Sequence, residues 1–180
     1  MSTKKIVITG GPGTGKTSII NELIKRNITC LEEISRQVTL DAQKRGIDQL
    51  FLTEPLLFSD MLLEGRQKQY VEAETYDSPY IFLDRGIPDV VAYMDFFKTD
   101  YPERFVNACE AHTYDHVFIL GPWQEIYTSD NERYENFDQA VEIHHCLVDT
   151  YSKYGYDLHD VPFESVEKRT DFILNIVENL

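Results

Sequence analysis

The stretch Gly10-Gly11-Pro12-Gly13-Thr14-Gly15-Lys16-Thr17 (GGPGTGKT, residues 10–17) decides the fold of this chain. It matches the pattern G-x-x-x-x-G-K-[ST] in full, and it lies between a short apolar run at 4–9 and a segment with helical spacing at 17–26. Glycines in such a loop let successive N–H groups turn inward around a phosphate, and the following helix adds the positive end of its dipole. We therefore expect the loop amides and Lys16 to bind the phosphates of a nucleotide and the Thr17 hydroxyl to bind magnesium.

Outward from this loop, the chain alternates between apolar runs and amphipathic segments. After the first strand at 4–9, the pattern predicts strands at 28–31, 80–83, 116–120 and 156–161. Helices are predicted at 17–26, 34–45, 56–74, 89–97, 103–111, 137–154 and from Ser165, a helix-capping residue, to the end. Strands that alternate with helices need crossover connections, so the pattern predicts an α/β fold with a mainly parallel sheet and helices on both faces. No linker interrupts it, and residues 1–180 are predicted to form a single nucleotide-binding domain.

The composition is that of an acidic globular protein. Seventeen Lys and Arg residues against 31 Asp and Glu residues give a net charge of −14. Such a field repels phosphate backbones and anionic lipids, so we expect neither nucleic acid nor a membrane as partner, although local donors can still hold a small anion. Three widely separated cysteines without metal-binding spacing, no signal peptide and no apolar run of membrane-spanning length predict a cytoplasmic protein.

The residues that follow the predicted strands are candidates for chemistry, because ligands of open parallel sheets bind at the carboxyl ends of the strands. Asp84 follows the strand at 80–83 and is placed to hold magnesium, directly or through water. The next residue is Arg85 and not the glutamate that polarises water in many ATPases, which favours phosphoryl transfer to another acceptor. Arg85 could steady the transferred phosphoryl group or a substrate anion; a structural ion pair is the alternative.

Glu33 and Arg36 follow the second predicted strand and are spaced to share one side of a helix start. A carboxylate at this position could accept the proton of a substrate hydroxyl, and its spacing from Arg36 favours Glu33 over Glu32 as this base. The alternative is an acid that favours the helix dipole and forms an ordinary ion pair.

The polar stretch 123–136 has the length and composition of a lid. Its arginine, Arg133, could close over the phosphates and stabilise charge during transfer; a plain surface residue is the alternative. Arg66, Gln67 and Tyr70 could line a substrate pocket, but for these residues we expect a solvated helix face. The adjacent His144 and His145 point to different faces of a helix and make poor metal ligands.

Taken together, GGPGTGKT, the Glu33-x-x-Arg36 pair, FLDRGIPDVVAY (82–93) and DNERYE (130–135) resemble a known family. They are similar to the AAA-type ATP-binding P-loop domain family, which lies near ribosylnicotinamide kinases and nucleoside kinases. The resemblance extends from Lys4 to the final helix. It implies a three-layer P-loop NTPase fold with a five-stranded sheet, the Asp84 strand beside the loop strand, and ATP and Mg²⁺ bound through Lys16, Thr17 and Asp84.

These observations predict a magnesium-dependent kinase that transfers the γ-phosphate of ATP to a small, hydroxylated, nucleoside-like metabolite. ATP is favoured over GTP because the chain lacks the guanine-reading pattern N-K-x-D. The alternative is a regulatory nucleotide-binding module or slow NTPase that acts through a protein partner. The predicted catalytic residues are Lys16, Glu33, Asp84, Arg85 and Arg133. The predicted nucleotide-binding residues are Gly10, Gly11, Pro12, Gly13, Thr14, Gly15, Lys16, Thr17 and Ser18. The acceptor is assigned to Glu33, Arg36 and Arg85, and magnesium to Thr17 and Asp84.

Overall fold

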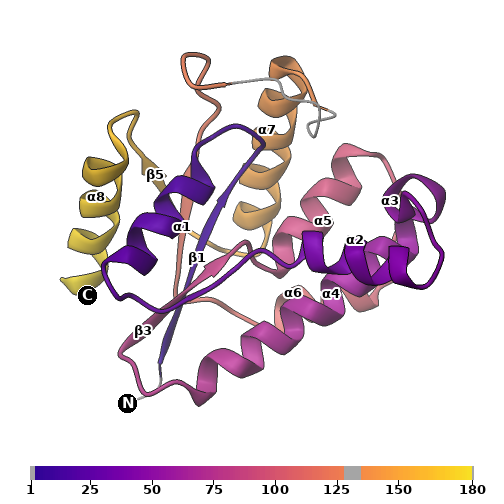
Figure 1. Ribbon diagram of the computed structural model, residues 1–180, viewed down its shortest axis with the longest axis horizontal. Helices are drawn as coiled ribbons and strands as arrows, with labels where there is room; N and C mark the ends of the chain where they lie inside the picture. Colours follow the sequence, from indigo (N-terminus) through magenta and orange to yellow (C-terminus); the bar gives the residue numbers. More distant parts are fainter. Residues whose placement is uncertain (1–2, 128–134, 180) are drawn as a thin grey trace.

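The computed structural model describes residues 3–127 and 135–179, and it is built around a parallel sheet (Figure 1). Five strands pair in the order β2-β3-β1-β4-β5, every neighbouring pair being parallel. The strands are β1 (Lys4–Gly10), β2 (Cys30–Leu31), β3 (Tyr80–Asp84), β4 (His116–Leu120) and β5 (Leu158–Val161). The predicted five-stranded parallel α/β fold is thereby confirmed. Ile8 of β1 pairs with Asp84 of β3, so the Asp84 strand lies beside the loop strand as expected.

Helices cover both faces of the sheet, which makes three layers. They are α1 (Lys16–Lys25), α2 (Ser35–Lys44), α3 (Leu50–Thr53), α4 (Pro55–Glu72), α5 (Ile87–Phe96), α6 (Arg104–Ala111), α7 (Phe137–Lys153) and α8 (Val166–Glu178), with a 3₁₀ turn at Ala73–Thr75. In Figure 1, α1 and α8 lie to the left of the sheet and α5 and α7 to the right. The short α3 was not predicted, and β2 and β5 are shorter than expected.

The core consists of two apolar layers, because successive side chains of a strand point to opposite faces of the sheet. Ile6 and Ile8 of β1 pack toward α1 and α8, whereas Val7 between them packs toward α5 and α7. Each such side chain stabilises the fold by roughly 1.5–3 kcal/mol when it is fully buried. Burial on both faces explains why β1, β3 and β4 read as continuous apolar runs and not as alternating ones.

The connections place every carboxyl strand end on one edge of the sheet. β1 continues into residues 10–17, β3 ends in Asp84, and β4 leads into the segment from Gly121 to Tyr127. This edge is where the candidate site is built. Within the described parts of the chain, no helix is long and apolar enough to cross a membrane.

Candidate nucleotide site

The loop at residues 10–17 has the backbone shape that phosphate binding requires. Gly13 and Gly15 adopt left-handed conformations with φ of 71° and 85°, which residues with a Cβ rarely adopt. The Thr14 hydroxyl donates to the Gly11 carbonyl at 3.0 Å and closes the loop. Because α1 begins at Lys16, its unpaired N–H groups and positive dipole end point to the loop interior. This arrangement fits an anion with several oxygens, such as the phosphates of a nucleotide.

Lys16 and Asp84 meet at the mouth of this loop. The Lys16 ammonium hydrogen-bonds the Asp84 carboxylate, and both residues are buried. Burial, together with the nearby charge of Arg85, lowers the pKa of Lys16 in spite of the opposing effect of Asp84. Thr17, in the first turn of α1, is exposed. A hydroxyl and a carboxylate are oxygen ligands of the kind Mg²⁺ prefers, so Thr17 and Asp84 fit the predicted magnesium site chemically.

Glu33 lies between two arginines. Its carboxylate accepts from Arg66 at 2.9 Å and from Arg85 at 2.5 Å, and it also accepts from the backbone N–H groups of Ile34 and Ser35. Burial alone would raise the pKa of Glu33, but Arg66, Arg85 and Lys16 outweigh this effect and hold it well below its usual range. The structure thus brings Glu33, Arg85, Lys16 and Asp84 together.

Arg66 corrects one expectation from the sequence. The predicted solvated helix face is wrong for this residue, whose side chain is 3% exposed. It reaches from α4 to Glu33 and donates to the Asp84 carbonyl at 3.2 Å. Arg36, in contrast, is exposed on α2. The ion pairs of Glu33 described here therefore come from more distant parts of the chain, and the roles assigned to Glu33 and Arg36 stay predictions.

Arg85 connects the end of β3 to the phosphate loop. Its backbone has a φ of 74°, a left-handed conformation that is uncommon for a residue other than glycine, and its N–H donates to the Ile8 carbonyl at 3.0 Å. The guanidinium donates to the Gly10 carbonyl at 3.2 Å and lies 5.4 Å from the Tyr93 ring centroid. Residues in such conformations cluster at functional sites, where the surrounding contacts hold them.

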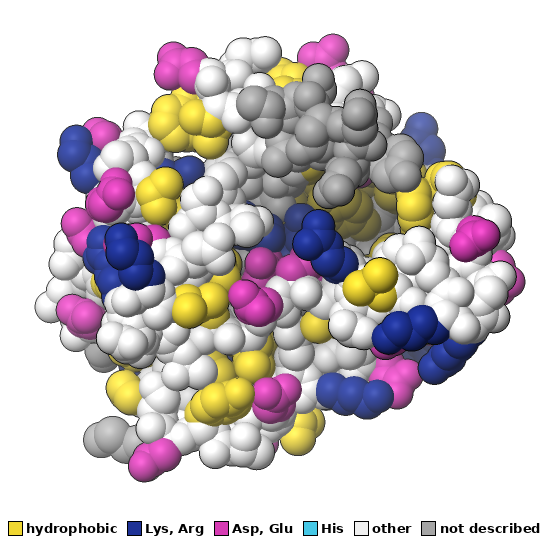
Figure 2. All heavy atoms as spheres, viewed as in Figure 1, with side chains coloured by type: hydrophobic (Ala, Val, Ile, Leu, Met, Phe, Trp, Pro, Cys, Tyr) yellow, Lys and Arg dark blue, Asp and Glu magenta, His cyan; other side chains and the backbone are white. Residues whose placement is uncertain are grey.

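Asp89 is a further buried acid of the site that sequence reasoning did not single out. Its carboxylate accepts from the Thr9 hydroxyl and the Tyr151 hydroxyl, each at 2.5 Å, and from the Gly86 N–H at 2.8 Å. The Arg85 Nη1 lies 3.5 Å from Asp89 Oδ1, the oxygen that also accepts from Thr9. The available signal was an acid in the first turn of α5, within the stretch DRGIPD. On the face of the molecule drawn in Figure 2, basic side chains lie directly beside acidic ones near the middle of the view.

On the outer side of the loop, a cavity of about 420 Å³ extends toward α8. Its lining combines the loop and the start of α1 with the β4 and β5 connections: Gly13, Gly15, Ser18, Trp123, Ile126, Glu164, Ser165, Val166 and Arg169. The predicted nucleotide-binding residue Ser18 lies here, whereas Trp123 and Arg169 were not predicted. Arg133, the predicted lid arginine, lies outside the described residues.

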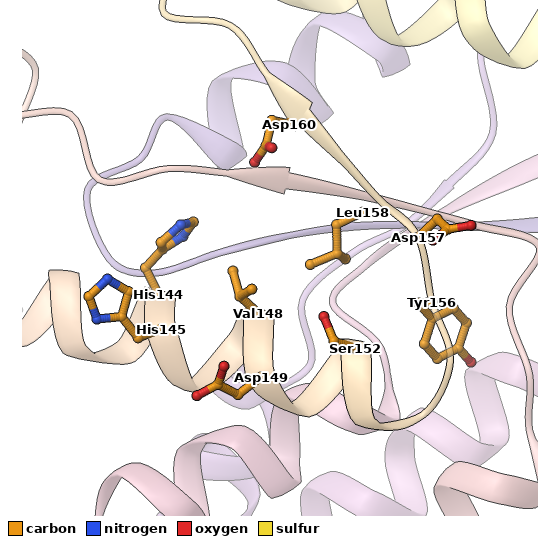
Figure 3. A pocket seen from close by; sticks show the side chains of 9 residues that line it. All are labelled: His144, His145, Val148, Asp149, Ser152, Tyr156, Asp157, Leu158 and Asp160. Carbon is orange, nitrogen blue, oxygen red and sulfur yellow. The ribbon is translucent and has the colours of Figure 1, made fainter.

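A second, larger groove of about 670 Å³ lies between α7 and β5 and contains no phosphate-loop residue (Figure 3). His144 and His145 project from α7 in different directions, as their adjacent positions predict. Among the residues that the structure describes, no group of three or more His, Cys, Asp or Glu side chains could hold a metal ion.

The loop, the parallel sheet and the acid beside the loop define the class of P-loop α/β proteins. A family profile described as "AAA domain" matches residues 5–169, and the chain belongs to this family. None of the curated proteins matches the chain in sequence.

Several solved structures share the fold at low sequence identity. Deoxyadenosine kinase from M. mycoides, with the products dCMP and dCDP bound, has a TM-score of 0.72 and 17% identity, over 98% of this chain and all of the other. Thymidylate kinase from Candida albicans has a TM-score of 0.70 and 14% identity, over 99% and 92% of the two chains. A NadR protein in complex with NR has a TM-score of 0.71 and 17% identity, over 98% of this chain and 50% of the other.

Proposed function

We propose that the chain is a magnesium-dependent kinase that transfers the γ-phosphate of ATP to a hydroxyl of a small, nucleoside-like molecule. The observation that carries the proposal is the cluster of Lys16, Asp84, Glu33 and Arg85 at the mouth of the phosphate loop. It would supply a cation for the phosphates, a metal ligand, a base and a second cation within one largely buried group. Solved structures that share the fold include a deoxyadenosine kinase and a thymidylate kinase, which are named for a nucleoside and a nucleotide and so support an acceptor of nucleoside-like chemistry.

Donor binding falls to the loop and its flanks. The backbone N–H groups of residues 10–17 bind the phosphate oxygens, and Lys16 turns from Asp84 to the β- and γ-phosphates. Asp84 and the Thr17 hydroxyl would hold magnesium, and the metal would offset the phosphate charge. Ser18 begins the outer side of the same site, which continues into the cavity beside α8.

Glu33 is proposed to activate the acceptor, and Arg85 is proposed to pair with Glu33 before transfer and with the phosphoryl group during it. The two arginines keep Glu33 ionised at neutral pH, so the carboxylate is ready to accept a hydrogen bond from the acceptor hydroxyl. When Arg85 shifts toward the transferred phosphoryl group, Glu33 loses one counter-charge and becomes a stronger base. Arg36 is proposed to contact the acceptor, and Arg133 to close over the phosphates.

Transfer of labelled phosphate from Mg-ATP to a panel of nucleosides and related hydroxylated metabolites tests this function. One acceptor should yield a labelled product, and Lys16→Ala should lower its formation by about a hundredfold or more, because a cation at the transferring group is lost. Lys25→Ala is the matched control, since Lys25 is an exposed lysine of the same helix. Nucleotide binding without product from any acceptor would contradict the kinase and support the regulatory module or slow NTPase instead.

A further inference from the structure

Arg169 is a buried arginine with an unused binding edge. It lies in the first turn of α8, is 1% exposed, and donates through Nη1 to the carbonyl of Thr14 at 3.0 Å. Its other two nitrogens, Nε and Nη2, have no hydrogen-bond partner among the described residues. These two atoms form the side-on edge of a guanidinium, which presents two parallel N–H donors to a single ligand.

This arrangement costs stability in the protein alone. A buried donor without a partner costs about 1–3 kcal/mol, and more when the group is charged. No ion pair compensates Arg169 within the described residues, and burial lowers its pKa. Such a group is expected to be satisfied when a ligand with acceptor atoms binds.

The position of Arg169 identifies which part of a ligand it faces. The side chain lines the 420 Å³ cavity and packs so closely on the phosphate loop that a Cβ on Gly15 would lie 2.8 Å from Nη1. A ligand in this cavity would therefore lie directly beside phosphates held by the loop, in a space whose lining includes neither Asp84 nor Glu33. In a nucleoside triphosphate the remaining parts are the ribose and the base, and the cavity is of a size that such ligands occupy.

We propose that Arg169 reads the N7 edge of a purine base on the phosphate donor. In the anti conformation the imidazole ring is the part of a purine nearest the 5′-phosphates, and N7 is its acceptor on that edge. Guanine adds O6 as a second acceptor and matches both donors, whereas adenine offers N7 alone and places an amino group opposite the second donor. At the position of N7 a pyrimidine presents a carbon and no acceptor, and cytosine places its amino group opposite the second donor. The donor site thus selects purines and accepts GTP at least as well as ATP.

Trp123 covers the same guanidinium and provides a way to observe this event. Its ring lies 5.6 Å from the Arg169 Cζ and stacks on Phe163 at a centroid distance of 5.2 Å. A base that bonds the free edge of Arg169 must displace or repack this ring. Because Trp123 is the only tryptophan of the chain, its fluorescence reports the cavity directly.

The inference rests on the proposed function, and a set of binding measurements separates the two. Calorimetry and Trp123 fluorescence, both with magnesium present, give the affinities of the full chain for ATP, 7-deaza-ATP, GTP, CTP and tripolyphosphate. We expect 7-deaza-ATP to bind about tenfold more weakly than ATP, since it lacks only N7, and CTP to bind at least as weakly. GTP should equal or exceed ATP.

Variants assign the effect to this side chain. Arg169→Lys keeps a positive charge but removes the side-on edge, so the difference between ATP and 7-deaza-ATP should disappear. Lys168→Met is the matched control, because Lys168 is the exposed neighbour in the same helix and should leave the difference unchanged. If Arg169→Lys does not fold, the comparison of ATP with 7-deaza-ATP in the unaltered protein still decides.

Equal affinity of the unaltered protein for ATP and 7-deaza-ATP, or equal affinity for ATP and CTP, overturns the role of Arg169 and leaves the phosphate site intact. Loss of binding for every nucleotide and for tripolyphosphate overturns the proposed function itself. Persistence of the ATP preference over 7-deaza-ATP in a folded Arg169→Lys variant also overturns the assignment.

Discussion

Glu33 illustrates at the residue scale how a carboxylate can be held ionised by its surroundings. Arg66 and Arg85 approach it at 2.9 Å and 2.5 Å, and two backbone N–H groups complete its hydrogen bonds. These donors hold its pKa well below the usual value of 4.5, although burial acts in the opposite direction. A group with a lowered pKa in the folded state stabilises the protein above the unfolded pKa, and this stabilisation is lost as the pH falls toward the folded pKa.

Glu33→Gln should therefore destabilise the protein in a pH-dependent manner. Near pH 7 the variant should be less stable than the unaltered chain by about 2–4 kcal/mol, because the buried Arg66 loses its counter-charge and the partly buried Arg85 loses one of two. Below about pH 4.5 the difference should shrink, since Glu33 itself then gains a proton in the unfolded state. Urea unfolding at several pH values between about 7 and 3 measures this.

The exposed Glu110, in α6, provides the control for this experiment. Glu110→Gln should change the free energy of unfolding little at any pH. A Glu33→Gln deficit that stays constant down to pH 3 would contradict the low pKa of Glu33.

Sequence spacing identified Glu33 but not its partners. An i, i+3 pattern points to Arg36, because spacing along a helix contains only local information. Arg66 and Arg85 reach the same carboxylate from α4 and from the end of β3. Arg66 and Arg85 meet at Glu33 only because the fold brings α4 close to the end of β3, and a local sequence pattern contains no information about this tertiary contact.

At the scale of elements, α7 begins with a reciprocal cap that can be tested separately from the site. Asn136 accepts from the Gln139 N–H at 2.9 Å, and the Gln139 side chain accepts in return from the Asn136 N–H at 2.9 Å. This arrangement satisfies two N–H groups that a helix start leaves unpaired.

Asn136→Ala should lower the free energy of unfolding by about 1 kcal/mol, and Asn136→Gly by only a few tenths, since glycine tolerates the extended cap conformation. Thermal unfolding by circular dichroism measures both variants. An unchanged free energy of unfolding in both variants would show that the side-chain cap contributes nothing.

The elements that the sequence predicted best are a continuous apolar run and a long amphipathic helix. The strand at 116–120 agrees with β4 at both ends, and the helix predicted at 137–154 ends within one residue of α7. The missed α3 has only four residues and follows Gln49, whose φ is 52°. A single turn held by tertiary contacts carries no period to detect, and the two-residue β2 at the sheet edge is similarly hard to delimit.

At the scale of the whole molecule, charge and its distribution matter most. The net charge is −14, yet Lys16, Arg66, Arg85 and Arg169 are withdrawn from the surface or nearly so. The carboxylates at the surface therefore repel one another, because these four cations lie inside the protein and do not offset them there. Arg169 and Trp123 were not predicted as residues of the site, because the local sequence does not show which side chains the fold brings beside the phosphate loop.

Salt should therefore stabilise the nucleotide-free protein. Raising NaCl from about 10 mM to about 300 mM shortens the screening length and weakens repulsion between surface carboxylates, so the melting temperature should rise by a few degrees. Differential scanning calorimetry in NaCl and in KCl measures this, and equal effects of both salts exclude a specific cation. A melting temperature that falls with salt would mean that attractive ion pairs dominate the surface.

The bond between Lys16 and Asp84 implies that the protein enters its ligand-binding reaction with the two key charges already neutralising each other. In the proposed kinase, binding would be an exchange of counter-ions: Lys16 would exchange the Asp84 carboxylate for phosphate oxygens, and Asp84 would exchange the Lys16 ammonium for magnesium. A nucleotide that binds without metal would leave the Asp84 carboxylate without a counter-charge. A metal that binds alone would displace the Lys16 ammonium and leave it without an anion. Only the two together keep every charge matched. For the proposed magnesium-dependent kinase, the resting pair would thus make the metal–nucleotide complex, and not either ion by itself, the species that this site takes up.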